Sequence, residues 1–306
     1  MSTAAPAPGS IRVRRRRPLE GVILLLLGAA AVVSLFVTVG IVFTLISEGL
    51  GFWSEVSPID FLTGTEWFPA LDTFGVLPLL AASLQIAAIA TLVAVPVGLG
   101  SAIYLSEYAP ERVRRVVKPV LELLAGMPTI VLGFFALNSI TPSLWSLGII
   151  ERGQIYNMLA AGIVVGLLIV PTIASLSEDA LRAVPRAMRE GAFGLGATRR
   201  VVSTRIVLPA ALSGVMASIV LAISRAVGET MAVTLAAGAQ PNLTADVRDP
   251  AQTITAVIVQ VSKGEAARGS TIYESIFVIG ATLFVVTLII NLIAVALVRR
   301  FRTVYQ

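Results

Sequence analysis

Long runs of apolar residues, separated by short charged segments, follow one another along the chain. About 20 predominantly apolar residues form a helix long enough to cross the hydrocarbon core of a bilayer. Six segments meet this requirement: residues 19–46, 76–104, 119–141, 157–180, 210–238 and 271–298. The third is the least regular, because Glu122 and the Gly126–Pro128 break interrupt it. The pattern predicts an all-α polytopic membrane protein with six transmembrane helices.

The composition agrees with this prediction and limits the possible chemistry. The chain has 306 residues, of which 56% are hydrophobic and 13% charged, and its mean hydropathy is +0.89. Soluble domains carry about 25% charged residues. Cys and His are both absent from the sequence, which excludes disulfides, thiol nucleophiles and most transition-metal sites. We therefore look for function in the placement of charged residues.

Basic residues gather on one side of the six segments. Of the 23 Lys and Arg residues, 18 lie before the first segment, in the second-to-third and fourth-to-fifth loops, or after the sixth. Loops rich in Lys and Arg stay in the cytoplasm, so both termini are predicted to be cytoplasmic. The net charge of +5 then reflects topology and contact with anionic lipid, and we infer no nucleic-acid site.

This topology divides the chain into five regions. They are a basic cytoplasmic tail (1–18), a first transmembrane helix (19–46), an extracytoplasmic loop (47–75), a five-helix core (76–298) and a short cytoplasmic tail (299–306). The core includes a cytoplasmic loop at 182–208 and an extracytoplasmic loop at 239–270. A signal peptide is the alternative for the first apolar run, but the run continues to Ile46, well beyond a signal core of about 7–15 residues.

The cytoplasmic loop at 182–208 is more ordered than its charge alone requires. Apolar residues recur at helical spacing and predict a stripe: Val184, Met188, Gly191 or Ala192, and Leu195. Basic residues are then expected elsewhere on the surface: Arg182, Arg186 and Arg189. Gly194 and Gly196 permit a turn before a second helix near Thr198. A helix–turn–helix with one apolar and one basic face suits insertion into a groove on a partner protein.

The same loop resembles the EAA motif of ABC importer permeases. The corresponding positions, with every spacing kept, are Glu190, Gly191, Ala192, Gly196, Ile206, Leu208 and Pro209. The departure is Gly191, where the family has Ala. The resemblance implies that these residues form a coupling helix seated on a nucleotide-binding ATPase subunit.

The two lysines argue that ATP is hydrolysed by that partner. Lys118 is followed by Pro119 and Lys263 by Gly264, so neither fits the G-K-[ST] of a phosphate-binding loop. We expect no cofactor in this chain; the resemblance implies that the partner ATPase binds ATP and Mg. The prediction is a transport subunit and not an enzyme.

Three further stretches narrow the resemblance: FGVLPLLAASLQIAAIATLVAVPVGLGSAIYLSEYAP (74–110), LELLAGMPTIVLGFFAL (121–137) and SRAVGETMAV (224–233). With the cytoplasmic loop they resemble the C-type permeases (PstC) of the bacterial phosphate ABC transporter, from about residue 60 to 298. The sister A-type permeases usually continue Ala-Pro where this chain has Met231-Ala232-Val233. Departures from the C-type pattern include Leu132 and Thr172, where the family often has Tyr. They bear on which anion is transported more than on the class of protein.

This resemblance implies a type I ABC importer permease of MetI-like fold in the bacterial plasma (inner) membrane. The implied partners are an A-type phosphate permease subunit, a nucleotide-binding ATPase subunit dimer, an extracytoplasmic phosphate-binding protein and membrane lipid. The implied function is ATP-driven import of inorganic phosphate along a pathway formed with the second permease. The alternatives are an ABC permease for molybdate, sulfate or phosphonate, and an ATPase-independent secondary transporter or channel.

Two charged residues lie inside the fifth apolar segment. Arg225 and Glu229 are four residues apart, so on one helix they share a face and can pair. Each charge costs about 2.5–3.5 kcal/mol at the bilayer centre, so the pair should face the bundle interior or a wet cavity. Either the pair only holds helices or a gate together, or Arg225, with Glu229 and Thr230 beside it, lines the substrate pathway and receives the anion.

Several smaller features carry expectations of their own. Glycines at 98, 100, 162 and 166 are interpreted as helix-packing contacts, and Pro128 as a kink or the start of a half-helix. Glu178 and Asp179 are expected to form ion pairs near the basic loop. Trp53 and Trp67 suit an interfacial aromatic belt in an outer loop that is a candidate landing surface for the binding protein.

The topology can be tested with reporters. A reporter fused after Gln306 and one inserted near Arg199 should both report the cytoplasm, because both positions follow Arg-rich segments. A reporter near Asp60, in the loop that has acids and no base, should report the exterior. An exterior signal at Arg199 would contradict the coupling-loop assignment, since no cytoplasmic ATPase could reach that loop.

Overall fold

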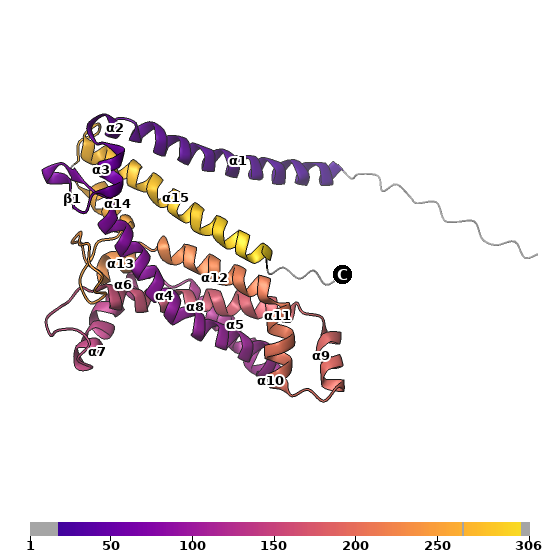
Figure 1. Ribbon diagram of the computed structural model, residues 1–306. Coiled ribbons are helices and arrows are strands. Elements are labelled where there is room, and N and C mark those ends of the chain that lie inside the picture. Colours follow the sequence, from indigo (N-terminus) through magenta and orange to yellow (C-terminus); the bar gives the residue numbers. More distant parts are fainter. Residues whose placement is uncertain (1–17, 265, 301–306) are drawn as a thin grey trace, which may run out of the picture.

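The computed structural model describes residues 18–264 and 266–300, and the side chains of residues 21–264 and 266–296 (Figure 1). The basic residues Arg12 and Arg14 to Arg17, and the chain after Arg300, lie outside the described residues. Helices make up most of the described chain. Its apolar helices run roughly along one long direction of the molecule, with short elements at both ends (Figure 1).

The first half of the chain contains the following elements: α1 (Pro18–Gly49), α2 (Phe52–Glu55), α3 (Pro58–Thr63), β1 (Trp67–Phe68), β2 (Thr73–Phe74), α4 (Leu77–Ile103), α5 (Glu111–Ala125), α6 (Thr129–Phe135) and α7 (Thr141–Ser146). The second half contains α8 (Met158–Arg182), α9 (Arg186–Gly194), α10 (Arg199–Val201), α11 (Leu208–Ala210), α12 (Leu212–Val227), α13 (Met231–Ala236), α14 (Ile254–Lys263) and α15 (Thr271–Arg300). Short 3₁₀ or π-helical turns join some of them: Pro69–Leu71, Tyr104–Tyr108, Ala136–Ile140 and Val202–Val207.

Four of the six predicted spans are confirmed as long apolar helices. They correspond to Gly21–Glu55, Leu77–Tyr108, Met158–Arg182 and Thr271–Ala296. A fifth helix long and apolar enough to cross a membrane is Thr129–Ser146. The described residues contain a sixth only if Arg199–Ala210 and Leu212–Val227, bent by 71°, count together.

The third and fifth predicted spans are wrong in their boundaries. Residues 119–125 belong to α5, which ends at Ala125, so the apolar spanning helix begins at Thr129 and not at residue 119. Residues 210–238 are not one helix, because α12 ends at Val227 and α13 begins at Met231. Both spans are therefore broken inside the apolar part of the chain.

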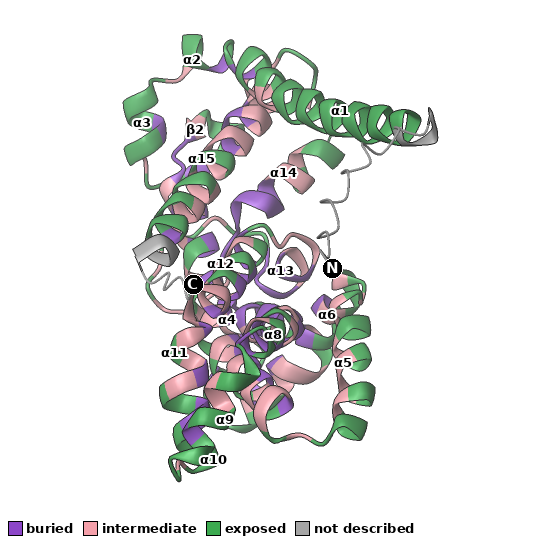
Figure 2. Ribbon diagram, turned by 90° about the vertical axis from the view of Figure 1, so that its right-hand side faces the viewer, coloured by how far each residue is buried: buried purple, intermediate pink, exposed green. Residues whose placement is uncertain are grey.

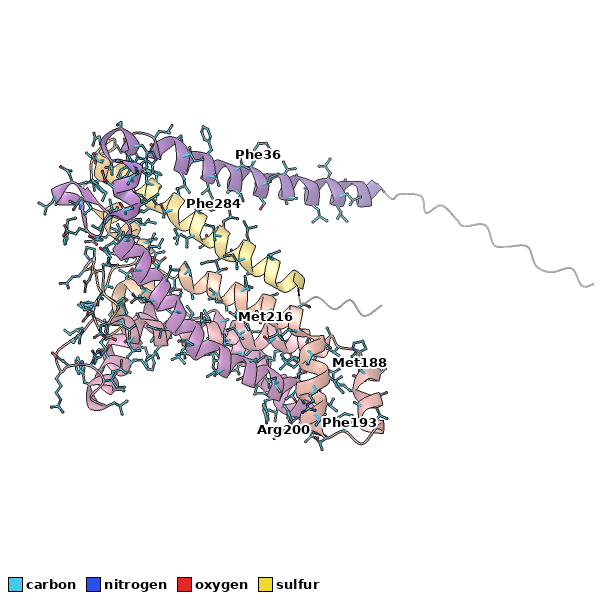
Figure 3. All side chains as sticks on the ribbon, viewed as in Figure 1. Phe36, Met188, Phe193, Arg200, Met216 and Phe284 are labelled. Atoms are coloured by element: carbon cyan, nitrogen blue, oxygen red, sulfur yellow. The ribbon has the colours of Figure 1, made fainter. Side chains whose placement is uncertain are left out.

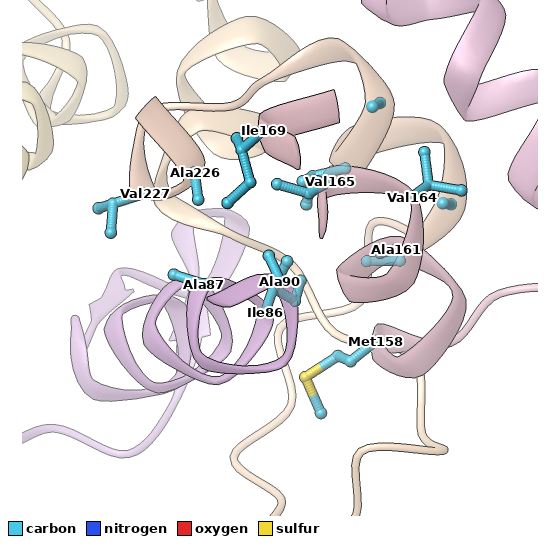
Figure 4. Close-up of a cluster of buried hydrophobic side chains, with 14 of the residues drawn as sticks. Ile86, Ala87, Ala90, Met158, Ala161, Val164, Val165, Ile169, Ala226 and Val227 are labelled. Atoms are coloured by element: carbon cyan, nitrogen blue, oxygen red, sulfur yellow. The ribbon is translucent and has the colours of Figure 1, made fainter. Parts of the chain in front are cut away.

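The centre of the molecule is the contact between α4 and α8. Small and β-branched side chains from α4, α8 and α12 fill it, as Figure 4 shows for Ala87 and Ala90 beside Val165 and Ile169. A Cβ on Gly162 would lie 2.6 Å from Ile89 Cβ, and one on Gly98 would lie 2.8 Å from Ile173 Cβ. The glycines therefore let the two backbones approach closely, as predicted for residues 98, 162 and 166. The prediction is wrong for Gly100, which has open space beside it.

Aromatic packing holds the end of the molecule that contains α2, α3 and the hairpin of β1 and β2. The hairpin is antiparallel, with Trp67 opposite Phe74. Phe52 contacts Phe61 and Phe74 edge-to-face, with ring centroids 5.8 and 5.2 Å apart. Trp67 is 2% exposed, so it belongs to this cluster and its expected place in an interfacial belt is wrong. Trp53, which is exposed, remains available for one.

The first helix is exposed over most of its length and meets α15 only near its end, where Gly49 is buried against Val278. None of the most apolar 18 residues of α1 is buried, and Figure 2 shows most of the helix exposed. Side chains such as Phe36 on α1 and Phe284 on α15 project from the ribbon (Figure 3). An apolar surface of this extent requires lipid or another membrane subunit around it.

The start of α1, the end of α15 and the α9–α11 segment lie at the same end of the molecule (Figure 1). The hairpin, α2 and α3 lie at the opposite end (Figure 1). This arrangement agrees with a topology in which both termini and the 182–208 loop share one side of a membrane. That this side is the cytoplasm stays a prediction.

The close approach of α4 and α8 gives a stability prediction. Gly162→Ala should lower the free energy of unfolding by about 1–3 kcal/mol, because the added methyl group would overpack against Ile89. Gly100→Ala is the matched control and should not destabilise the protein, since nothing lies within 4 Å of its Cβ position. Thermal unfolding of the purified proteins in detergent measures both. Equal midpoints for the two variants would contradict the packing role of Gly162.

Candidate transport pathway and coupling segment

Two helices stop inside the apolar part of the chain. α5 ends at Ala125 and α6 starts at Thr129, directly after Pro128. α12 ends at Val227 and α13 starts at Met231. Pro128 therefore precedes a separate short helix, so a mere kink is the wrong interpretation. The two short helices that follow the breaks, α6 and α13, pack against each other, with Gly133 against Leu235.

Arg225 connects the two breaks. Its Nη2 donates to the carbonyl oxygen of Ala125 at 3.1 Å, and its Nη1 donates to Thr172 Oγ1 at 3.2 Å. The last carbonyls of a helix have no partner within the helix and carry the negative end of its dipole. A guanidinium at the end of α5 therefore both satisfies a free carbonyl and places a positive charge where the dipole favours it.

Arg225 and Glu229 do not form the predicted pair. α12 ends between them, so they do not share a helical face. Glu229 Oε1 instead accepts from the Ala232 amide at 3.3 Å, at the start of α13. Within the described residues, no ion pair involves Arg225 or Glu229. The four-residue spacing misled because Gly228 and the cap of α13 end the regular helix there.

Thr230 lies in the same break and has local partners. Its Oγ1 donates to the Gly228 carbonyl at 3.2 Å, and its own carbonyl accepts from Thr234 Oγ1 at 2.7 Å. The carbonyl of the neighbouring Glu229 accepts from Thr255 Oγ1 at 3.0 Å, which ties the break to the start of α14. Thr230 and Glu229 thus shape the break, while Arg225 reaches across to the neighbouring helices.

The arrangement leaves a positive charge available. An arginine side chain has five N–H donors. Arg225 uses one nitrogen for the Ala125 carbonyl and one for the Thr172 hydroxyl, so other donors remain for a further acceptor. Arg225 is exposed on this chain and no carboxylate of the described residues neutralises it. Such a guanidinium can bind an oxyanion through paired hydrogen bonds.

Sequence reasoning missed the two partners of Arg225. Thr172 was notable only as a departure from a tyrosine, and Ala125 has no functional side chain at all. The signal that could have found the Ala125 carbonyl is the Gly126–Pro128 break, since a helix that ends there must expose carbonyls.

The predicted coupling segment is confirmed as a helix–turn–helix. α9 ends at Gly194, and Gly196 has a φ of +80°, which only glycine adopts without strain. Thr198 then caps the next helix, its Oγ1 accepting from the Val201 amide at 3.4 Å. The segment projects from one end of the molecule, with Met188 and Phe193 on α9 (Figures 1 and 3).

The motif residues divide between the inside and the outside of this segment. Ala192 is buried, while Ile206 and Leu208 are half-buried beside it in the same apolar cluster. Glu190, Gly191, Gly196 and Pro209 are exposed. On α9 and the turn after it, the side chains of Glu190, Phe193 and Leu195 are exposed on the surface of the chain.

Two expectations for the segment are wrong. Leu195 is 90% exposed and does not extend the buried stripe of Val184 and Ala192, because α9 ends at Gly194 before the stripe returns. Arg189 was expected on the surface, but its side chain is only 17% exposed and donates to Glu107, Leu181 and Val184.

The ion pairs expected for Glu178 and Asp179 are confirmed. Glu178, 1% exposed, accepts from Arg114 Nε at 2.7 Å and from Lys118 Nζ at 2.9 Å. Lys118 also donates to Asp179. These bonds join the C-terminal part of α8 to α5.

On the opposite end, a charged clasp shapes the 239–270 loop. Arg248 donates to the Asp246 carboxylate, and this hydrogen bond lowers the pKa of Asp246 to about 2. Gln154 donates to the Arg248 carbonyl at 2.6 Å, which attaches the clasp to the loop before α8. The loop thus presents an ordered outer surface; its role as a landing surface for a binding protein stays a prediction.

Comparison with known proteins gives consistent relatives. The family described as "Binding-protein-dependent transport system inner membrane component" matches residues 94–303. The probable ABC transporter permease protein YqgH of Bacillus subtilis is 32% identical over 92% of this chain and 89% of its own length. The phosphate transport system permease protein PstC of Mesorhizobium japonicum is 33% identical, covering 87% of this chain and 86% of the relative.

Solved structures give the same fold. The ABC transporter for import of the acidic polysaccharide alginate matches with a TM-score of 0.65 at 16% identity, over 92% of this chain and 96% of that chain. The inward-facing MetNI methionine ABC transporter matches with a TM-score of 0.59 at 18% identity, over 78% of this chain and 100% of that chain. The predicted all-α, MetI-like permease fold is confirmed.

The family match covers more than half of the chain, and the relatives at 32–33% identity cover most of it. The chain therefore belongs to the family of binding-protein-dependent transport system inner membrane components, the multi-pass permease subunits of ABC importers, and PstC-type phosphate permeases are among its relatives.

Proposed function

We propose that this chain is the C-type permease of an ATP-driven importer of inorganic phosphate. It forms the translocation pathway together with a second, A-type permease in a bacterial plasma membrane. The observation that supports an anionic substrate is the exposed Arg225 guanidinium at the two helix breaks, because no carboxylate of the described residues pairs with it. The likeness to phosphate permeases supports phosphate as that anion.

The contacts of Arg225 suit brief rather than tight binding. A phosphate oxygen that approaches the guanidinium competes with the Ala125 carbonyl and the Thr172 hydroxyl for the same donors. Those neutral acceptors take the donors back when the anion leaves. A transporter needs this balance, because a site that holds its substrate too strongly slows release.

ATP hydrolysis belongs to the partner in this proposal. The exposed Glu190, Phe193 and Leu195 form the surface of α9 and its turn that enters a groove on a nucleotide-binding ATPase dimer. ATP and Mg are bound by that dimer, and this chain contributes no hydrolytic site. Closure of the dimer moves α9 and opens the pathway alternately to the two sides of the membrane.

An extracytoplasmic phosphate-binding protein delivers the substrate. The alginate transporter was solved in complex with a substrate-bound periplasmic protein. In this chain the surface for such a partner is the end that contains α2, α3, the hairpin and the clasped 239–270 loop.

A different oxyanion is the second candidate substrate. Thr172, which contacts Arg225 directly, stands where phosphate permeases often have Tyr. Sulfate, molybdate and phosphonate offer the guanidinium similar oxygens. An ATPase-independent secondary transporter is disfavoured, because the exposed EAA-type segment has no purpose without an ATPase.

Reconstitution tests the function. The chain, the A-type permease, the ATPase and the binding protein in liposomes should accumulate labelled phosphate only with ATP. Glu190→Arg should leave the complex assembled and uncouple ATP hydrolysis from uptake, since the reversed charge faces the ATPase. Glu190→Gln, which removes the charge without reversing it, should uncouple less. Uptake of sulfate or molybdate in place of phosphate would favour the second candidate. Uptake without any ATPase would contradict the proposal.

The role of Arg225 has its own test. Arg225→Gln should reduce phosphate uptake by roughly 10- to 100-fold, the loss expected for charged hydrogen bonds worth about 1.5–3 kcal/mol, and Lys should restore it in part. Glu229→Gln is the matched control and should transport well, because its amide oxygen can still accept from Ala232.

Assembly of the complex and docking of the binding protein should survive in both variants. Normal uptake by Arg225→Gln, or by the doubly neutral Arg225→Gln with Glu229→Gln, would contradict a pathway role for Arg225.

A further inference from the structure

Arg189 lies on α9 directly before the motif residue Glu190, yet it points the other way. Its Nη1 donates to the Val184 carbonyl at 2.6 Å and its Nη2 to the Leu181 carbonyl at 2.7 Å. Nη2 and Nε also reach the two carboxylate oxygens of Glu107 at 3.0 and 3.4 Å. All three nitrogens of the guanidinium are therefore engaged with the core of the permease.

These contacts anchor α9 to the ends of two long helices. Leu181 is in the last turn of α8 and Val184 lies two residues beyond its end, so both carbonyls belong to the end of the helix, where carbonyls lack partners four residues ahead. Glu107 lies in the π-helical turn at the end of α4 and is 9% exposed. A half-buried charge pair of this kind is costly to separate, because each partner would be left desolvated and unpaired.

Apolar packing alone holds α9 weakly. The helix has nine residues, of which Ala192 is the single buried one and Met188 is half-buried. Both are small or flexible side chains with modest contact area. The Arg189 contacts are therefore the main fixed link between α9 and the core.

A second polar network extends this link to α5. Glu178 on α8 accepts from Arg114 and Lys118 on α5, at 2.7 and 2.9 Å. The far end of α5 is Ala125, whose carbonyl accepts from Arg225. Fixed contacts thus run from α9 through the end of α8 and along α5 to the helix breaks.

We propose that Arg189 is the positioning residue that makes the coupling helix move as one body with the ends of α4 and α8 and with α5. The inference rests on the proposed function, in which an ATPase moves α9. Glu190 faces that ATPase, while Arg189 on the same helix passes the displacement inward. Loss of Arg189 leaves α9 attached to the ATPase but loosely attached to the permease.

Transport assays on the assembled importer test the coupling. Arg189→Gln and Glu107→Gln should preserve assembly and ATP hydrolysis, and raise the ATP hydrolysed per phosphate transported by roughly tenfold, the weight of one charged hydrogen bond. Arg189→Lys should fall between them and the wild type, since an ammonium keeps the charge but cannot form the fork. Arg115→Gln is the control, because Arg115 is exposed and forms no ion pair within the described residues. A wild-type ratio in Arg189→Gln would overturn the proposal.

Spin-label distances test the mechanical link directly. This chain has no cysteine, so Ala187→Cys on α9 and Arg112→Cys on α5, both at exposed positions, give a unique label pair in a complex assembled with cysteine-free partner subunits. The assembled complex should show one narrow distance that is the same in the resting and ATP-trapped states. Adding Arg189→Gln should broaden it, whereas Arg115→Gln should not. An equally narrow distance with Arg189→Gln would overturn the proposal.

The two kinds of failure are distinguishable. Absence of ATP-driven phosphate uptake by the wild-type complex would refute the proposed function. The label distance needs no phosphate transport and judges the link between α9 and α5 by itself. Arg189→Gln could instead lose assembly or thermal stability in proportion to its loss of transport, with an unchanged ratio of ATP hydrolysed to phosphate transported. That result would assign Arg189 a purely structural role and overturn the inference.

Discussion

A helix that stops inside a membrane protein leaves backbone groups that lipid cannot satisfy, and this constraint organises the interior of the permease. α5 stops at Ala125 and α12 at Val227. Arg225 donates to the free carbonyl of Ala125 at the end of α5, and Glu229 accepts from the Ala232 amide at the start of α13. Because Arg225 comes from one broken helix and serves the other, the two breaks form a single structural feature.

The continuous helices around these breaks give the feature a fixed frame. α4 and α8 approach closely at glycines such as Gly162 and share a core of small side chains. α5 is fastened to α8 near its start by Glu178 and meets Arg225 at its end. A displacement of the α9 end of the molecule can therefore reach the breaks through packed and hydrogen-bonded contacts.

The sequence predicted those parts of the fold that local physics determines. Uninterrupted apolar length located α1, α4, α8 and α15, and turn chemistry located the coupling segment through Gly196 and Thr198. The Gly126–Pro128 break after α5 was visible in the sequence, but the separation into two helices was not assigned there, and the end of α12 was missed, because Gly126 and Gly228 permit a break without requiring one. The pairing of Arg225 with Glu229 failed for the same reason, since a four-residue spacing brings side chains together only while the helix continues.

The sequence explained the arginines of the 182–208 loop by topology alone, and this explanation overlooked the separate role of Arg189. The positive-inside rule states which side of the membrane a residue occupies and nothing about the direction of its side chain. Arg189 and Arg225 in fact share one mode of attachment, because each donates to carbonyls at the end of a helix. They differ in charge compensation: Glu107 neutralises Arg189, whereas no carboxylate of the described residues pairs with Arg225. A neutralised guanidinium can only hold helices together, and an uncompensated one retains the attraction for an anion. The presence or absence of that one carboxylate therefore separates the arginine that we propose fastens the coupling helix from the arginine that we propose meets the substrate.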